Sequence, residues 1–201
     1  MSKGVALVVG CSGFVGSHVT KALLQRGFSV RGTCRDPRQT RAKFEDSWTC
    51  TKNQSLELTE FSLPEDGSPV PEEILDELVQ GVVGVFLCAG HDKQEPATID
   101  FMVDTALSVL KAVRKINSRI PVVMTSTKGN SNLPEAAAGA LKNEIEFWSD
   151  PAKQNSASQF SPAGETLMEI KALEFFGRNS QNQAVFDSFD FDSFQNHEIQ
   201  K

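Results

Sequence analysis

The chain opens with a strand-like apolar run that ends in three closely spaced glycines and then becomes helical. The run covers residues 5–9, and Gly10, Gly13 and Gly16 follow it. The first glycine permits a tight turn, the second a close approach of the backbone to a bound group, and the third close packing of helix on strand. A helix that begins there directs backbone N–H groups and the positive end of its dipole to one point. The pattern predicts a pyrophosphate site, with a glycine-rich turn of another α/β domain as the alternative.

Strand and helix signals alternate along the rest of the chain. This alternation predicts an α/β fold: a doubly wound, Rossmann-like parallel sheet between two helical layers. The predicted strands are 5–9, 29–34, 55–58, 82–89, 121–126 and 184–186, and the predicted helices are 14–26, 37–44, 71–79, 97–116 and 164–176.

The end of the chain has a different composition. Residues 186–194 alternate phenylalanine with aspartate and serine, which is compatible with a strand with one apolar face or with a disordered tail. We therefore predict a Rossmann domain over 1–186 and an irregular segment over 187–201.

Length and composition favour a single cytoplasmic domain. The chain has 201 residues, which is enough for a substantial core. Its longest apolar stretches are shorter than the roughly 20 residues of a membrane helix, and the first strand begins too early to leave room for a signal peptide. The four cysteines, Cys11, Cys34, Cys50 and Cys88, show no CxxC spacing. The absence of CxxC spacing favours reduced thiols in a cytoplasmic protein over a zinc or other metal site.

Charge is distributed unevenly. The net charge is -6, but residues 1–45 carry eight Lys or Arg against Asp36 and Glu45. These cations cluster just after the second predicted strand. They favour a phosphorylated small ligand over the alternative, a nucleic-acid partner.

The order of elements and several motifs resemble the extended short-chain dehydrogenase/reductase superfamily. The resemblance rests on the glycine turn and on Val30-Arg31-Gly32-Thr33-Cys34-Arg35-Asp36-Pro37, Gly84-Val85-Phe86-Leu87-Cys88-Ala89-Gly90 and Val122-Val123-Met124-Thr125-Ser126-Thr127. Within that superfamily, the chain most resembles the dihydroflavonol reductase and cinnamoyl-CoA reductase group. The resemblance extends over roughly residues 3–186, and its motifs are specific up to about residue 130.

The resemblance implies a dinucleotide site, with NADP(H) favoured over NAD(H). Arg35 is expected to pair with the 2′-phosphate of the adenosine, whereas an NAD site usually carries an acid at this place. Binding of NAD(H) stays an alternative, because Asp36 is such an acid and because the cations could be solvated surface residues. The cofactor-binding residues that it implies are Gly10, Ser12, Gly13, Phe14, Val15, Gly16, Arg35, Glu57, Leu58, Ala89, Gly90 and Lys171.

The resemblance also implies hydride transfer between a nicotinamide and a small carbonyl or alcohol substrate. Thr127 is expected to orient the substrate oxygen, and Lys171 matches the lysine of the family's YxxxK helix, with a plain surface lysine as the alternative. The tyrosine of that motif should be residue 167, which is leucine, and the chain contains no tyrosine. Leucine cannot donate a proton.

Two readings of function therefore stay open. The chain also ends near the sixth predicted strand, so that most of the family's substrate domain is missing. In the first reading the protein is an NADP-dependent reductase. In the second it is an inactive nucleotide-binding module, or a truncated isoform, that acts through a partner. Helices 97–116 and 164–176 correspond to those through which family members pair, so a homodimer is a further expectation.

Overall fold

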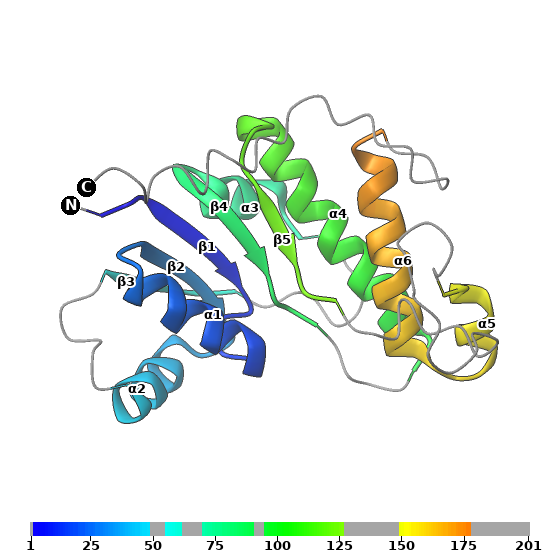
Figure 1. Cartoon of the computed structure of the whole chain (residues 1–201), viewed down its shortest axis with the longest axis horizontal. Helices are drawn as coiled ribbons and strands as arrows, with labels where there is room; N and C mark the ends of the chain where they lie inside the picture. Colours follow the sequence, from blue (N-terminus) through cyan, green and yellow to red (C-terminus); the bar gives the residue numbers. More distant parts are fainter. Residues whose placement is uncertain (1, 49–54, 62–69, 91–94, 127–148, 178–201) are drawn as a thin grey trace, which may run out of the picture.

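Five parallel strands form one sheet at the centre of the protein (Figure 1). The computed structural model describes residues 2–48, 55–61, 70–90, 95–126 and 149–177. The strands are β1 (Val5–Val9), β2 (Ser29–Cys34), β3 (Leu56–Glu60), β4 (Val82–Leu87) and β5 (Val122–Met124), and the sheet order is β3-β2-β1-β4-β5. The direction in which the sheet grows reverses between β1 and β4, which is the place where open α/β sheets bind ligands.

Helices cover both faces of the sheet, so that the predicted α/β fold with three layers is confirmed. Leu7 and Val9 of β1 point to one face and pack with residues of α3, α4 and α6. Ala6 and Val8 point to the other face and pack with residues of α1 and α2. The helices are α1 (Phe14–Gln25), α2 (Pro37–Ser47), α3 (Glu72–Val79), α4 (Ala97–Asn117), α5 (Pro151–Ser156) and α6 (Phe160–Phe175).

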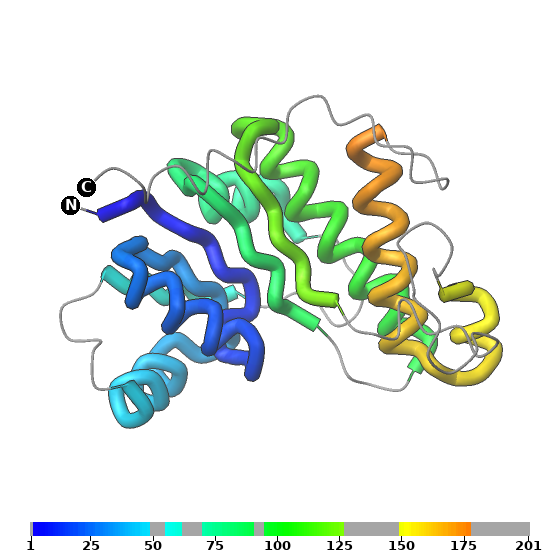
Figure 2. The backbone as a smooth tube through the Cα atoms, in the orientation of Figure 1, coloured from blue at the N-terminus to red at the C-terminus, as the bar shows by residue number. Residues whose placement is uncertain are grey.

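The chain turns directly from β1 into α1, and β4 runs beside β1 (Figure 2). The ladder pairs Val9 with Leu87, so that the carboxyl ends of β1 and β4 lie together. On the other side, Val8 pairs with Gly32 of β2. The residues that follow these three strands therefore meet at one edge of the sheet.

The helix α2 extends three residues beyond its predicted end at residue 44. Phe44 is buried, and its ring stacks on that of Trp48 with centroids 4.0 Å apart and an interplanar angle of 14°. Both side chains belong to the core between α2 and the sheet. This apolar contact holds the last turn of the helix on the sheet.

The sequence did not predict α5, and α6 begins four residues before its expected start. The side chain of Asp150 caps α5, accepting from the backbone N–H of Ala152 at 2.9 Å, and Pro151 occupies the first helical position. An Asp-Pro pair at this position is a typical helix start. In α6, Pro162 lies in the first turn, where its missing N–H costs nothing.

Other predictions fall on residues outside the described ranges: Cys50, the sixth strand at 184–186, the tail over 187–201, and Thr127. No helix in the described ranges combines the length and apolarity that a membrane crossing needs. Among the same residues, no group of three or more His, Cys, Asp or Glu is placed to hold a metal ion.

Candidate functional site

The glycine turn between β1 and α1 is built so closely that two of its positions exclude a side chain. Gly10 has φ +82°, and a Cβ there would lie 2.8 Å from the backbone nitrogen of Ala89. A Cβ on Gly16 would lie 2.1 Å from the carbonyl oxygen of Gly10. Both contacts are with backbone, which cannot move aside as a flexible side chain does. The turn therefore brings α1 directly against the end of β1 and beside the end of β4.

Thr33 of β2 holds the turn from the side. The Gly10 N–H donates to its hydroxyl oxygen at 3.1 Å, and the Cys11 N–H donates to its carbonyl oxygen at 2.9 Å. The Thr33 side chain is buried. No local sequence pattern identifies Thr33, because its role depends on the pairing of β1 with β2.

Gly13 differs from the other two glycines of the turn. A Cβ there would meet only the Gly10 carbonyl oxygen, at an ordinary 3.5 Å, and its φ of -71° is open to any residue. The protein itself therefore does not require glycine at this position. A glycine that the fold does not need is what close approach of a bound group would require.

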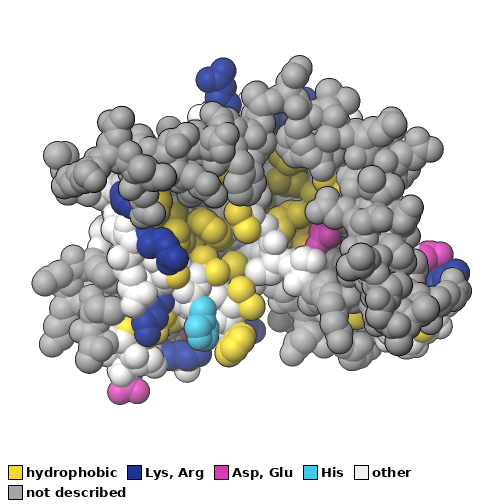
Figure 3. Space-filling model, viewed as in Figure 1, with side chains coloured by type: hydrophobic (Ala, Val, Ile, Leu, Met, Phe, Trp, Pro, Cys, Tyr) yellow, Lys and Arg dark blue, Asp and Glu magenta, His cyan; other side chains and the backbone are white. Residues whose placement is uncertain are grey.

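The N-terminus of α1 is open to solvent. Gly13 is its N-cap and offers no side chain, and its first turn contains no acidic residue. Phe14 is 83% exposed and Val15 is also exposed. His18 Nδ1 lies 2.8 Å from the Phe14 carbonyl oxygen, to which it donates. On the face drawn in Figure 3, a His side chain lies near several Lys and Arg side chains. The end of the helix dipole is thus available to an anion.

Arg35 and Asp36 follow β2 at the same edge of the sheet. Both are exposed, and Arg35 forms no hydrogen bond or ion pair with the described residues. Asp36 is the N-cap of α2: its carboxylate oxygen Oδ1 accepts from the Gln39 N–H at 2.9 Å. The carboxylate therefore has a partner in its own helix. The Asp36-Pro37 pair is the sequence signal for this cap.

Not every nearby cation is available to a ligand. Arg41 donates to the Leu56 carbonyl oxygen at 3.1 Å. Arg31 donates from Nη1 to the carbonyl oxygens of Glu77, Leu78 and Gln80, at 2.8–3.2 Å, and from Nε to Glu57 at 3.3 Å. The bonds of Arg31 hold the end of α3 against β2 and β3.

The two residues predicted in β3 lie away from the carboxyl edge. Glu57 is the second residue of the strand, pairs with Arg31 in the ladder and is bonded to its side chain. Leu58 packs into the core between the sheet and helices α1 and α2. Ala89 and Gly90, by contrast, follow β4 directly, and the Cys88 N–H donates to the Val9 carbonyl oxygen at 2.9 Å. The structure thus brings together the glycine turn, Arg35 and the residues after β4.

Three thiols lie beneath this edge. Burial, together with the neighbouring Cys34 thiol, raises the pKa of Cys11 to about 12, and burial raises the pKa of Cys88 to about 11. Both groups are therefore protonated at neutral pH. A protonated, buried thiol is a poor nucleophile, so these residues belong to the packing of the site and not to its chemistry.

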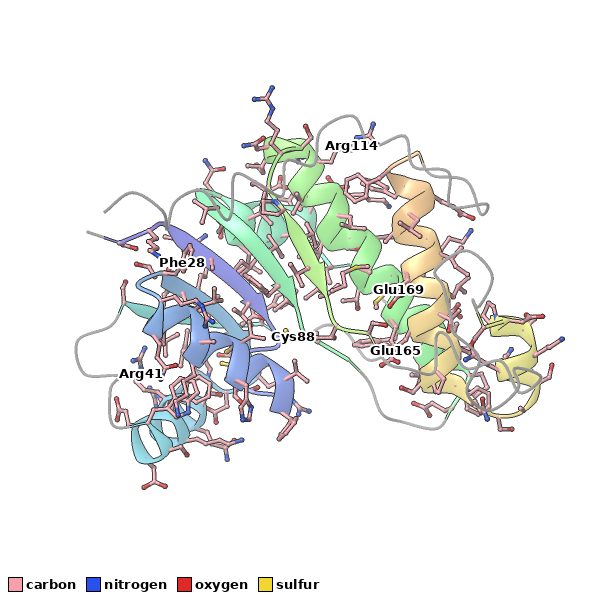
Figure 4. The ribbon with its side chains drawn as sticks, in the orientation of Figure 1. Phe28, Arg41, Cys88, Arg114, Glu165 and Glu169 are labelled. Atoms are coloured by element: carbon pink, nitrogen blue, oxygen red, sulfur yellow. The ribbon has the colours of Figure 1, made fainter. Side chains whose placement is uncertain are left out.

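Lys171, the lysine that matches the YxxxK motif, lies in α6. Figure 4 shows Glu165 and Glu169 on the side of α6 nearer the sheet and the end of β4. Lys171 lies two residues after Glu169, a rotation of about 200° around an α-helix, and so projects from a different side. Its Nζ pairs with Glu174 Oε2 at 2.8 Å, and 44% of its side chain is exposed. Its catalytic and cofactor-binding roles stay predictions, as does the role of Thr127.

Comparisons with known proteins agree with this architecture. Residues 2–146 match the NmrA-like family. The chain is 32% identical over 188 residues to dihydroflavonol 4-reductase of Hordeum vulgare, covering 89% of this chain and 50% of that protein. The chain thus spans about half the length of the curated relatives that it matches.

Solved structures share the fold. Vestitone reductase from alfalfa (Medicago sativa) superposes with a TM-score of 0.66 and 27% identity, over 87% of this chain and 53% of that one. Yeast methylglyoxal/isovaleraldehyde reductase Gre2, crystallised with NADPH, superposes with a TM-score of 0.69 and 18% identity, over 86% of this chain and 53% of that one. The predicted resemblance is confirmed, and the chain belongs to the NmrA-like family within the extended short-chain dehydrogenase/reductase superfamily.

Proposed function

We propose that this chain binds NADP(H), with the pyrophosphate at the N-terminus of α1 and the adenosine 2′-phosphate on Arg35. The observation that carries the proposal is that the N-cap of α1, Gly13, has space around it. This N-cap follows β1 at the point where the sheet reverses its direction of growth. Its N-cap lacks a side chain, and no acid lies in the first helical turn. The fold shared with a reductase crystallised with NADPH supports the same ligand class.

The preference for NADP(H) over NAD(H) rests on Arg35 and Asp36. A guanidinium matches the geometry and charge of a phosphate, whereas an acid at the end of β2 suits the hydroxyls of an unphosphorylated ribose. Asp36 is the acid in question here, and its Oδ1 is bonded to the Gln39 N–H of α2. Arg35 is exposed and makes no bond with the described residues.

For the reaction, we propose the class of the relatives: reduction of a small carbonyl group or oxidation of the corresponding alcohol. A bound nicotinamide supplies or accepts the hydride. The protein would hold the dinucleotide at the carboxyl edge of the sheet, and the hydroxyl of Thr127 would orient the substrate oxygen. Activity and substrate are both proposals, since the chain spans about half of each relative.

A second candidate is a nucleotide-binding module without turnover. The specific observation is that residue 167 is leucine and that the 201 residues contain no tyrosine to carry the proton. Lys171, which would assist such a tyrosine, pairs with Glu174 on the exposed surface. Both defects affect proton transfer, and neither affects the glycine turn.

Calorimetric titration with NADPH and NADH tests the binding site. Gly13→Ala adds a methyl group that the fold accommodates, since its nearest contact would be 3.5 Å, but that lies where a phosphate would approach. We expect NADPH to bind at least about tenfold more weakly to this variant, the loss that about 1.4 kcal/mol produces. The matched control is Gly84→Ala in β4, whose Cβ would lie 3.7 Å from Pro121.

Arg35→Ala tests the preference between the two cofactors. Loss of a charge-assisted hydrogen bond, about 1.5–3 kcal/mol, should weaken NADPH by about tenfold or more and leave NADH nearly unchanged. Equal losses for the two nucleotides would refute the 2′-phosphate role. If the folded wild type binds neither nucleotide, both candidate functions fail.

Oxidation of NADPH with a panel of aldehydes and ketones separates the two candidates. Turnover that Thr127→Ala abolishes, with NADPH affinity retained, would establish the reductase. NADPH binding without turnover of any substrate would select the module.

A further inference from the structure

The connection from β2 to α2 is short. The strand ends at Cys34 and the helix begins at Pro37, so that only Arg35 and Asp36 lie between them. Interactions that hold the start of α2 in place therefore also restrict the backbone of Arg35. This matters because Arg35 is the residue to which the proposed function assigns the 2′-phosphate.

Asp36 fixes the start of the helix with both of its acceptor groups. Its Oδ1 accepts from the Gln39 N–H at 2.9 Å, and its carbonyl oxygen accepts from the Thr40 N–H at 3.0 Å. Thr40 is 5% exposed, so the second bond is anchored in the core. The ring of Pro37 restricts the backbone between these bonds further.

The other side of Arg35 is anchored as well. Cys34 is 3% exposed, and its carbonyl oxygen accepts from the Phe61 N–H, after the end of β3, at 2.9 Å. Arg35 thus lies between a buried strand end and a capped helix start, with its own side chain exposed. A cation held in this way loses little conformational entropy when a phosphate binds.

We propose that Asp36 is a positioning residue for the selection of NADPH over NADH. The inference rests on the proposed function and deepens it. The carboxylate caps α2, which holds Arg35 at the edge of the sheet, and its Oδ1 accepts from the Gln39 N–H and so faces its own helix. The acid that would ordinarily select the unphosphorylated cofactor here contributes to recognition of the 2′-phosphate.

Three substitutions separate this role from a direct electrostatic one. Asn and Ser cap helices about as well as Asp, whereas Ala does not. For Asp36→Asn and Asp36→Ser we therefore expect NADPH affinity within about twofold of the wild type and an unchanged ratio of NADPH to NADH affinity. Asp36→Ala should weaken NADPH by about fivefold, the loss typical of a missing N-cap, and weaken NADH less.

The chain offers a matched control. Asp150 caps α5 in the same Asp-Pro arrangement, accepting from the Ala152 N–H at 2.9 Å, and α5 packs on α6. Asp150→Ala should lower stability by a similar amount and leave the affinities for both nucleotides unchanged. This comparison distinguishes positioning of Arg35 from a general loss of stability.

The outcomes are distinct. If Asp36→Asn and Asp36→Ser behave like Asp36→Ala, the charge acts directly and the inference is overturned. It is overturned also if Asp36→Ala matches the wild type, or if it changes both affinities equally. If the wild type binds NADPH and Asp36→Ala binds it equally well, the proposed function survives and only this inference fails; if the wild type binds neither nucleotide, both fail.

Discussion

The carbonyl oxygen of Gly10 occupies the space where a Cβ on residue 16 would lie, with only 2.1 Å between the two positions. The contact joins the end of β1 to the first turn of α1, and both partners are backbone. The close approach of α1 to the sheet therefore depends on the absence of a single methyl group.

Gly16→Ala should lower the free energy of unfolding by about 2 kcal/mol or more, because overpacking against rigid backbone forces the helix to move. Urea denaturation followed by circular dichroism measures the loss. Gly84→Ala is the control, since its added methyl group makes only ordinary contacts, 3.7 Å from Pro121, and should change stability little. A Gly16→Ala protein as stable as this control would contradict the geometry of the turn.

Arg31→Ala should lower the free energy of unfolding by about 1.5–3 kcal/mol, because the carbonyl groups at the end of α3 lose their charged donor. Arg31 reaches three of them, at Glu77, Leu78 and Gln80. Lysine lacks the several N–H donors of the planar guanidinium group, so Arg31→Lys should restore only part of the loss. Full rescue by lysine would show that charge alone matters.

A matched cation gives the baseline for this comparison. Lys43 of α2 is exposed and forms no bond with the described residues. Lys43→Ala should change stability by less than about 0.5 kcal/mol in the same urea experiment.

The thiols beneath the site predict a loss of stability at alkaline pH. The folded-state pKa values of Cys11 and Cys88, about 12 and about 11, exceed the ordinary value of 9.0. The unfolded chain therefore releases these protons first. The associated stability is complete below pH 9 and is lost as the pH rises from 9 toward 12.

Urea denaturation at pH 8 and pH 10 measures this effect. In Cys88→Ala the decrease in unfolding free energy between the two pH values should be smaller than in the wild type, because one of the linked groups is gone. An identical decrease would show that Cys88 keeps its ordinary pKa in the folded state.

Lys171→Met should lower the free energy of unfolding by less than about 1 kcal/mol, because its ion pair with Glu174 is exposed. From its place on α6 we also expect NADPH affinity to change by less than about twofold, within the 1 kcal/mol scale of such surface contacts. Calorimetric titration checks the second expectation. A large loss of affinity in the folded variant would instead support the cofactor-binding role that the YxxxK resemblance assigns to this lysine.

The strands β1 and β2 have the predicted bounds. For β1 the reason is that a buried parallel strand is a continuous apolar run, which a sequence shows directly. The glycine turn was equally readable, since all of its requirements lie within one strand, turn and helix. Helix α5 was missed because a polar surface helix carries no clear apolar periodicity, although Asp150 and Pro151 signalled its start.

Contacts between strands were beyond the reach of the sequence. The bonds of Thr33 to the glycine turn, and of Glu57 to Arg31, depend on which strands pair and in what register. The packing of α6 on α4, where Gly164 lies close to Met102, is another contact that no local pattern shows. Local patterns thus predicted the glycine turn, and tertiary packing decided its surroundings.

The stacked pair of Trp48 and Phe44 gives α2 an optical reporter of its own. The indole is buried against the sheet at the end of the helix opposite to Asp36. Emission from a buried indole shifts to longer wavelength when water reaches it. In a Trp148→Phe variant, which keeps Trp48 as its one tryptophan, undocking of α2 would therefore be visible without any added label. Ordering of the helix could then be timed in the same cuvette in which a ligand is mixed.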